Sequence, residues 1–252
     1  MITKLQLYLS YKYKEKLTYQ ISSSMQGILM ELISTDYASK LHADGLKPYH
    51  QYVSEMTENT FTWTVCTLDQ EAKEEIIDPL MKQKIFQLKH KDIELAVLEQ
   101  NLSVKSYEAL IQEYYFQDQS RDIHFRFLSP SSFKSQGHYV ILPDVKLIFQ
   151  SLMNKYDAFS TETKVGDELV LDHIENYCFI KRYDLKSVRF ALEGTGVNGF
   201  IGELTIHING PQQLVNLCNM IAAFGEYSGV GIKCAMGMGA LKIIKRNGGK
   251  AR

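Results

Sequence analysis

A histidine and a lysine five residues apart are the first candidates for chemistry in this chain of 252 residues. His42 follows an apolar repeat typical of a helix, and Lys47 lies beyond Gly45, where that helix is expected to end. The negative end of the helix dipole favours a protonated histidine, by roughly 0.3–1 kcal/mol when it is exposed. A group that exchanges protons beside a fixed cation suits phosphodiester cleavage. Spacing alone favours a plainer interpretation, in which His42 complements the helix end and Lys47 is solvated.

The segment Gly229–Gly239 holds two Gly-apolar-Gly triplets on either side of five residues, one of them Lys233. Glycine permits positive φ and close backbone approach, and successive N–H groups in such a loop can form an anion site. The segment follows a predicted helix and opens a strand, which is the reverse of a dinucleotide fingerprint, and no Gly-Lys-Ser/Thr follows its last glycine. A tightly packed connection and an anion-binding loop both remain open.

Composition excludes several classes of protein. Hydrophobic residues make up 45% of the chain, but no apolar run reaches transmembrane length and the first residues do not resemble a signal peptide. The four cysteines are widely scattered without a CxxC pair, as expected of reduced thiols in a cytoplasmic protein. We expect no membrane partner.

Charge is distributed unevenly along the chain, although the formal net charge is only −1. Residues 1–119 carry 12 Lys and Arg against 17 Asp and Glu, and residues 120–252 carry 16 against 12. No acid follows Glu226, whereas Lys233, Lys242, Lys245, Arg246, Lys250 and Arg252 do. A basic second half indicates a polyanionic partner, with a solvated basic tail as the commoner alternative for residues 245–252.

The order of predicted elements is β-α-β-β-α-β, repeated twice. Leu5, Leu7 and Leu9 alternate in a first strand, and apolar residues from Met25 to Leu41 recur at helical spacing behind a Ser23–Gln26 capping box. Strands near 50–56 and 60–68, a helix around 70–84 capped by Asp69, and a strand near 92–99 complete the first set.

The second set comprises a strand around Ile123–Phe127, a helix from Val145 to Tyr156, and two long strands near 177–192 and 199–208. A helix opened by Pro211, the glycine loop and a last strand follow. The pattern predicts an α+β protein of two tandem ferredoxin-like domains, 1–118 and 119–252, with the boundary near 115–121. Fold alone does not assign a function.

Three segments, in this order, resemble the CRISPR repeat-processing endoribonucleases, which cut precursor CRISPR RNA into guide units. The first is Leu41-His42 followed by Lys47-Pro48-Tyr49, and the third is the Gly229–Gly239 loop with its closing strand. The second is Leu128-Ser129-Pro130-Ser131-Ser132-Phe133-Lys134, then Tyr139, Leu142-Pro143 and Phe149-Gln150-Ser151-Leu152.

The resemblance implies a metal-independent endoribonuclease that acts on CRISPR repeat RNA. A 2′-hydroxyl would attack the adjacent phosphate and leave a 2′,3′-cyclic phosphate and a 5′-hydroxyl. His42 matches the family's proton-transferring histidine, Lys47 matches a lysine that stabilises phosphate charge, and the glycine loop matches the RNA-contacting loop. Some members carry a tyrosine where Met30 stands, which leaves open whether a tyrosine or the nearby His50 joins His42. A homodimer is also implied.

Further RNA contacts are expected on one long strand of the second domain, which carries Lys181, Lys186 and Arg189. Together with Gly229, Gly231, Lys233, Gly237 and Gly239, these are the predicted RNA-binding residues. No Asp/Glu cluster has convincing magnesium spacing, and we interpret Asp167-Glu168 and Asp172-His173 as a charged loop or strand edge. No metal or cofactor is expected.

Two other functions compete with the enzyme. A non-catalytic RNA-binding subunit of a CRISPR effector complex would share the ferredoxin-like domains and the glycine loop. A structural protein without an RNA partner would make that loop merely architectural.

Overall fold

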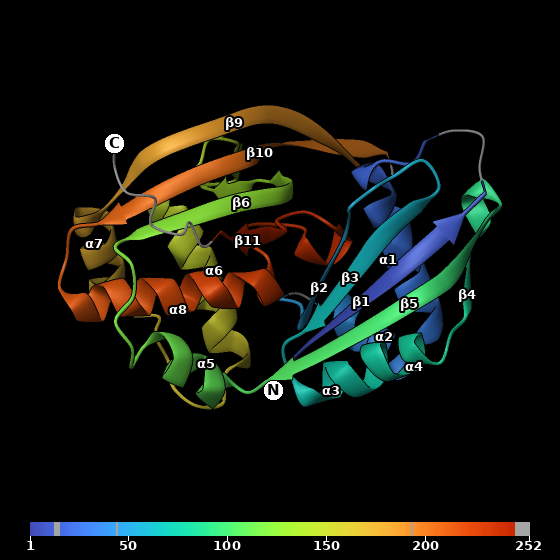
Figure 1. Cartoon of the computed structure of the whole chain (residues 1–252), viewed down its shortest axis with the longest axis horizontal. Helices are drawn as coiled ribbons and strands as arrows, with labels where there is room; N and C mark the ends of the chain where they lie inside the picture. Colours follow the sequence, from blue (N-terminus) through green and yellow to red (C-terminus); the bar gives the residue numbers. More distant parts are fainter. Residues whose placement is uncertain (13–15, 44, 193, 245–252) are drawn as a thin grey trace.

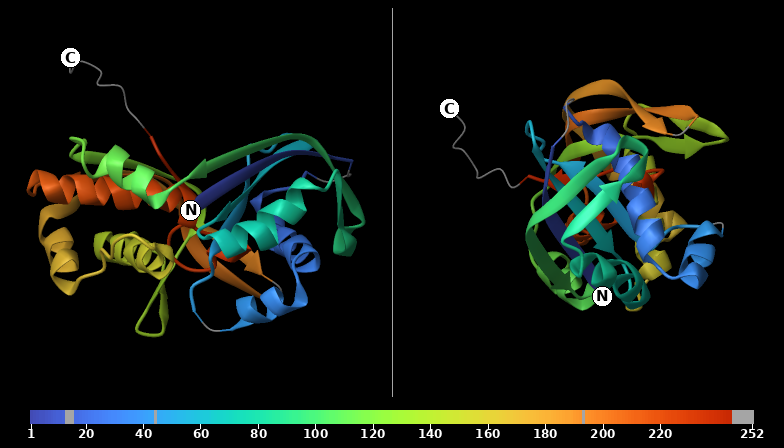
Figure 2. Two further views of the ribbon diagram at one scale, coloured as in Figure 1. Left: turned by 90° about the horizontal axis from the view of Figure 1, so that it is seen from below. Right: turned by 90° about the vertical axis from the view of Figure 1, so that its right-hand side faces the viewer.

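The computed structural model describes residues 1–12, 16–43, 45–192 and 194–244 and arranges them in two α+β units. The units lie side by side along the long axis of the molecule (Figure 1), and the view from below shows the same arrangement (Figure 2, left). The basic residues Lys245, Arg246, Lys250 and Arg252 lie outside the described residues.

The first unit is an antiparallel sheet in the order β2-β3-β1-β5-β4, with helices packed on one face. Apart from the edge strand β4, this is the order of a ferredoxin-like unit. Leu5, Leu7 and Leu9 alternate along β1 and are fully buried, as their period predicts. The elements are β1 (Ile2–Tyr11), a 3-10 turn (Tyr19–Ile21), α1 (Ser22–Leu32), α2 (Thr35–His42), β2 (Tyr49–Ser54), β3 (Thr60–Thr67), α3 (Gln70–Ala72), a π turn (Lys73–Ile77), α4 (Asp78–Met81), β4 (Ile85–Leu88), a 3-10 turn (Lys89–Lys91) and β5 (Ile93–Lys105).

The apolar repeat over 25–41 forms two helices, so the prediction of one helix is wrong. Ile33 leaves the helical conformation with ψ of 161°, and the Ser34 side chain begins α2 by accepting a hydrogen bond from Tyr37 N at 3.2 Å. Ser34 N in turn donates to the Glu75 carboxylate at 3.2 Å. A partner 41 residues away therefore stabilises the break, while the apolar side chains still face one core.

The second unit has the antiparallel order β11-β6-β10-β9, again that of a ferredoxin-like unit. Phe125 and Phe127 of β6 share a core with α6 and α8. The segment with Asp167 and Asp172 is a helix, not the charged loop or strand edge expected, and Asp167 caps it. The elements are β6 (Asp122–Ser131), β7 (Phe133–Ser135), β8 (His138–Val140), α6 (Val145–Phe159), α7 (Glu168–Tyr177), β9 (Cys178–Leu192), β10 (Thr195–Ile208), α8 (Gln212–Ser228), a 3-10 turn (Cys234–Met236) and β11 (Leu241–Ile243).

A short helix between the two sheets, α5 (Tyr107–Tyr114), did not emerge from the sequence. Its Tyr107 hydroxyl donates to Leu68 O at 2.9 Å, and both residues belong to the core of the second unit, as does Ile2. The glycine segment contributes in the opposite direction, because Ala235 belongs to the core of the first unit. Each unit thus buries residues of the other at their junction.

Candidate active site

The Gly229–Gly239 segment reaches from the second unit across to the first. Figure 1 shows the chain between α8 and β11 lying against β2, and the buried side chain of Gln51 on β2 holds it there. Gln51 Nε2 donates to Ala235 O at 3.2 Å and to Ser22 O at 2.8 Å, while its Oε1 accepts from Trp63 Nε1 at 3.0 Å. A side chain buried in the first unit therefore fixes the position of the loop.

Close packing explains why this segment is rich in glycine. Gly231 and Gly239 have φ of +76° and +75°, a region that residues with a side chain seldom adopt. A Cβ atom on Gly231 would lie 2.2 Å from Ser132 O, and one on Gly239 would lie 2.0 Å from Val230 O. The architectural interpretation of these glycines is thus correct, whatever the loop binds.

The loop's amides do not form a concave anion site, which was one of the two alternatives that the sequence left open, because most of them donate to other protein groups. What the loop presents outward is the exposed side chain of Lys233, itself at φ of +56°. The hydrogen bonds that these amides donate include Val230 N to Gly239 O at 2.9 Å, Gly231 N to Ser151 Oγ at 2.8 Å, Ile232 N to Ser132 O at 3.0 Å and Gly239 N to Pro130 O at 2.9 Å.

His42, Lys47 and Lys233 line a single cavity of about 410 Å³ between the end of α2 and the glycine loop. Two motifs from opposite ends of the chain therefore meet in one place. The described lining contains three lysines, with Lys155 as the third, and one histidine, but no carboxylate. Such a lining, with cations and no described acid, has the charge that attracts an anion.

His42 is the last residue of α2 and is exposed, so its ring can reach a bound substrate. Its place in the last turn exposes it to the negative end of the helix dipole, as the spacing predicted. Lys47 folds back onto the same helix end, where its Nζ donates to Ala43 O. The cavity therefore combines an exposed imidazole with a lysine that is held at the same helix end.

Lys155 was missed by the sequence analysis. It is only 6% exposed, and its Nζ donates to Gly229 O at 2.9 Å, to Ser228 O at 3.4 Å and to Cys234 Sγ at 2.9 Å. A signal was present: Lys155 lies three residues after Leu152, on the apolar stripe of α6. A lysine at such a position is seldom fully buried without a reason.

The wall of the cavity also contains Tyr49, Gln26 and Met30. Gln26 Nε2 donates to the Tyr49 hydroxyl at 3.2 Å instead of closing a capping box with Ser23, so that predicted box is not formed. Burial raises the pKa of Tyr49 to about 12, which keeps the phenol protonated at neutral pH. A thioether stands where the resemblance places a tyrosine.

His50, the reserve candidate for proton transfer, is fully buried beneath the loop. Its ring stacks on Tyr52 at 5.2 Å and lies 3.0 Å from where a Cβ on Gly229 would be. Burial, followed by the charge of Lys155, lowers the pKa of His50 to about 3. A neutral ring without access to solvent supports the loop and cannot exchange protons with a substrate.

The cations predicted on the long strand β9 do not line this cavity. Lys181 Nζ pairs with the Asp122 carboxylate at 2.7 Å, which neutralises it. Lys186 and Arg189 are exposed and have no ion pair with any described residue. Of the three, these two keep a free charge, and the main chain at Arg189 contacts the first unit through Gln20 at 2.7 Å.

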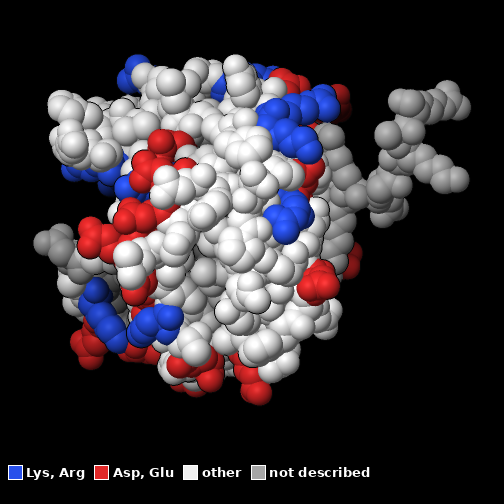
Figure 3. Space-filling view, turned by 90° about the vertical axis from the view of Figure 1, so that its left-hand side faces the viewer, with Lys and Arg blue, Asp and Glu red and all other residues white. Residues whose placement is uncertain are grey.

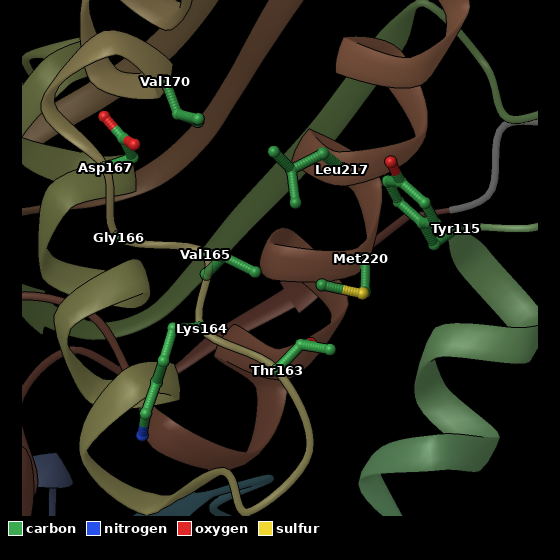
Figure 4. A pocket seen from close by; sticks show the side chains of 9 residues that line it. All are labelled: Tyr115, Thr163, Lys164, Val165, Gly166, Asp167, Val170, Leu217 and Met220. Carbon is green, nitrogen blue, oxygen red and sulfur yellow. The ribbon is translucent and has the colours of Figure 1, made fainter.

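A second cavity, of about 510 Å³, lies between α7 and α8 and is lined mainly by apolar side chains (Figure 4). Its Asp167 caps α7, and its Lys164 donates to the carbonyls of Asp157 and Ser160. The end of the molecule that carries α7 is uncharged over much of its face, with acidic side chains along one side and cations mainly nearer its margins (Figure 3). Nothing in this region assembles groups for chemistry on a phosphate.

Other classes of site are not found in the part of the chain that the structure describes. No three His, Cys, Asp or Glu side chains come together there as metal ligands would. The four cysteines are buried and free. No described helix is long and apolar enough to cross a membrane.

Comparison with known proteins decides the family. Residues 125–241 match the family described as CRISPR-associated endoribonuclease Cas6. A Cas6 endoribonuclease of Streptococcus thermophilus is 31% identical over 226 residues, which cover 90% of this chain and 92% of that protein. This chain belongs to the Cas6 family. A Cas6 endoribonuclease of Mycobacterium tuberculosis is also 31% identical, over 87% of this chain and 70% of the relative.

Solved Cas6 structures confirm the fold. Thermus thermophilus Cas6 in a product complex superposes with a TM-score of 0.81 at 22% identity, covering 97% of this chain and all of that one. A Cas6 substrate mimic complex gives a TM-score of 0.76 at 18% identity, covering 96% and 99%. The expected pair of ferredoxin-like folds is therefore correct, and so is the assignment to the repeat-processing endoribonucleases.

Proposed function

We propose that the chain cleaves CRISPR repeat RNA within precursor transcripts and does so without a metal ion. The observation that carries this proposal is the cavity that unites His42 with Lys47 and Lys233 and has no carboxylate in its described lining. A phosphodiester supplies the anion that such a lining lacks. The relatives that share the family are CRISPR-associated endoribonucleases, two of them solved with product or with a substrate mimic.

In the proposed reaction the 2′-oxygen attacks the adjacent phosphorus as the bond to the 5′-oxygen breaks. His42 removes the proton from the 2′-hydroxyl or donates one to the leaving 5′-oxygen, and the products are a 2′,3′-cyclic phosphate and a 5′-hydroxyl. Lys47 stabilises the charge that grows on the phosphoryl oxygens. Lys233, with Lys186 and Arg189 further away, holds the backbone of the RNA.

The proposal is tested by incubating the purified chain with candidate repeat RNAs in EDTA. A cut at one position, leaving a cyclic phosphate, is the expected result. Tight binding without product would favour the non-catalytic subunit, and the absence of any salt-dependent RNA affinity would favour an architectural role. No cleavage across several repeats would overturn the proposal.

We expect Lys233→Ala to weaken RNA binding more than it slows the cleavage of bound RNA. The side chain extends outward from the loop, so its loss removes one phosphate contact, and the slope of log affinity against log salt should fall by about 0.7. Filter binding at several salt concentrations and single-turnover cleavage measure the two effects. Lys91→Ala, which removes an equal charge from an exposed turn that does not line the cavity, is the matched control and should leave both unchanged. A larger loss in rate than in affinity would place the loop in the chemistry itself.

Several parts of the proposal extend beyond this site. We propose cytoplasmic action, with processed guide RNA, effector-complex subunits and a second copy of the chain as further partners. The division into domains 1–118 and 119–252 belongs to the proposal too, with His42 on the first and the RNA-holding loop on the second.

A further inference from the structure

The buried ammonium group of Lys155 has no counter-ion among the described residues. No described carboxylate lies within 4.0 Å of its Nζ, and none lines the cavity. Lys155 also lines an adjoining cavity of about 270 Å³, to which Lys134 contributes a further cation. Burying a charge is costly unless it is paired, so this arrangement calls for an anion.

The groups that hold Lys155 compensate only part of its charge. Ser228 O and Gly229 O lie at the C-terminal end of α8, where the helix dipole is equivalent to roughly half a negative charge. The third partner, Cys234 Sγ at 2.9 Å, is a weak acceptor when it is a thiol. A substantial positive charge therefore remains at the floor of the cavity.

The three hydrogen bonds that Lys155 Nζ donates connect the two ends of a turn in the glycine loop. Gly229 begins the loop, and Cys234 follows directly after Lys233, so Lys155 ties together the two points between which the loop turns. All three ammonium hydrogens are engaged in these bonds. Lys155 can thus act on a bound phosphate through its field and through the loop, without donating to it directly.

We propose that Lys155 is a positioning residue for the RNA: its buried charge is compensated by a phosphate that enters the cavity, and its bonds orient Lys233 toward that phosphate. The inference rests on the proposed function, because it takes repeat RNA as the ligand. The competing role is purely structural, in which Lys155 only caps α8. The two roles differ in what salt does to RNA affinity.

The test compares Lys155→Met, Lys155→Gln and Lys155→Arg with the wild type, using the cognate repeat RNA. Affinity is measured over a range of salt concentrations, and single-turnover cleavage is measured at saturating protein. Circular dichroism and thermal melts first establish that each variant is folded. Lys155→Gln keeps a donor for the two carbonyl groups, so it decides the outcome if Lys155→Met does not fold.

We expect the slope of log affinity against log salt to fall by about 0.7 in the neutral variants, the value for one phosphate on a single strand. Cleavage of bound RNA should slow by about tenfold, because the phosphate is less well placed. Lys155→Arg should restore the wild-type slope. Loss of a helix cap alone would lower the melting temperature and leave the slope unchanged.

A wild-type slope in either folded neutral variant would overturn the inference, and so would a reduced slope in folded Lys155→Arg. If the wild-type chain neither binds nor cuts repeat RNA, the proposed function has failed. If the wild type cuts and the slopes are equal, only the role of Lys155 has failed.

Discussion

Replacing His42 with alanine is expected to slow repeat cleavage by about 10²–10⁴-fold, the usual contribution of a positioned proton-transfer group. RNA affinity should change little, because the three lysines that gather the phosphate remain in the cavity. The His42 ring is exposed at the end of α2, so its removal leaves no cavity in a core and the chain should stay folded. Replacing His42 should therefore lower the cleavage rate while leaving the RNA affinity nearly unchanged.

Single-turnover cleavage at saturating protein measures this effect without interference from product release. His173→Ala is the matched control: this histidine is also exposed on a helix, α7, and does not line the cavity, so the rate should stay at the wild-type value. Full activity of the His42 variant would be compatible with the proposed endoribonuclease activity, but it would show that His42 takes no part in the reaction.

Replacing Gly231 with alanine is expected to reduce the free energy of unfolding by about 2–5 kcal/mol, through two separate costs. One is the strain of a side chain at φ of +76°. The other is the clash of its Cβ with Ser132 O, which is backbone and 2.2 Å away. The displaced loop should also carry Lys233 out of the cavity and weaken RNA binding.

Gly137→Ala separates the two costs. Gly137 has φ of +83° but nothing within 4 Å of an added Cβ, so only the strain applies, at about 1–2 kcal/mol. Urea unfolding of both variants gives the comparison. Equal losses at the two positions would show that the loop relaxes away from Ser132 without cost, against the tight packing described above.

Much of the fold follows from short-range patterns. Alternation along β1 identified a buried face correctly, because strand geometry repeats every two residues whatever surrounds it. The βαββαβ order of both units was likewise predictable. Breaks set by distant partners were not: Ser34 interrupts the helix with the help of Glu75, which no local pattern reveals.

The site was predictable only in its pieces. His42 and Lys47 were candidates on spacing, and the glycine loop on composition, but their roles in the reaction stay predictions. Lys181 illustrates the limit, since its ion pair with Asp122 spans 59 residues and removes a charge that the sequence left free. His50 illustrates it again, because proximity to Lys47 in sequence says nothing about complete burial.

The sequence by itself determined the two ferredoxin-like units and the resemblance to repeat-processing endoribonucleases. Both of these depend on residue type and short-range periodicity. Only the tertiary structure decided that the loop's amides are already used, that Lys155 completes the cavity, and that Lys233 and His42 share it. The contact from Gln51 to Ala235 spans 184 residues, and the energy of burying a cation depends on every neighbour brought around it. The conformational preferences of short segments do not contain these contributions from distant neighbours. The charged cavity is therefore defined only when the chain is folded.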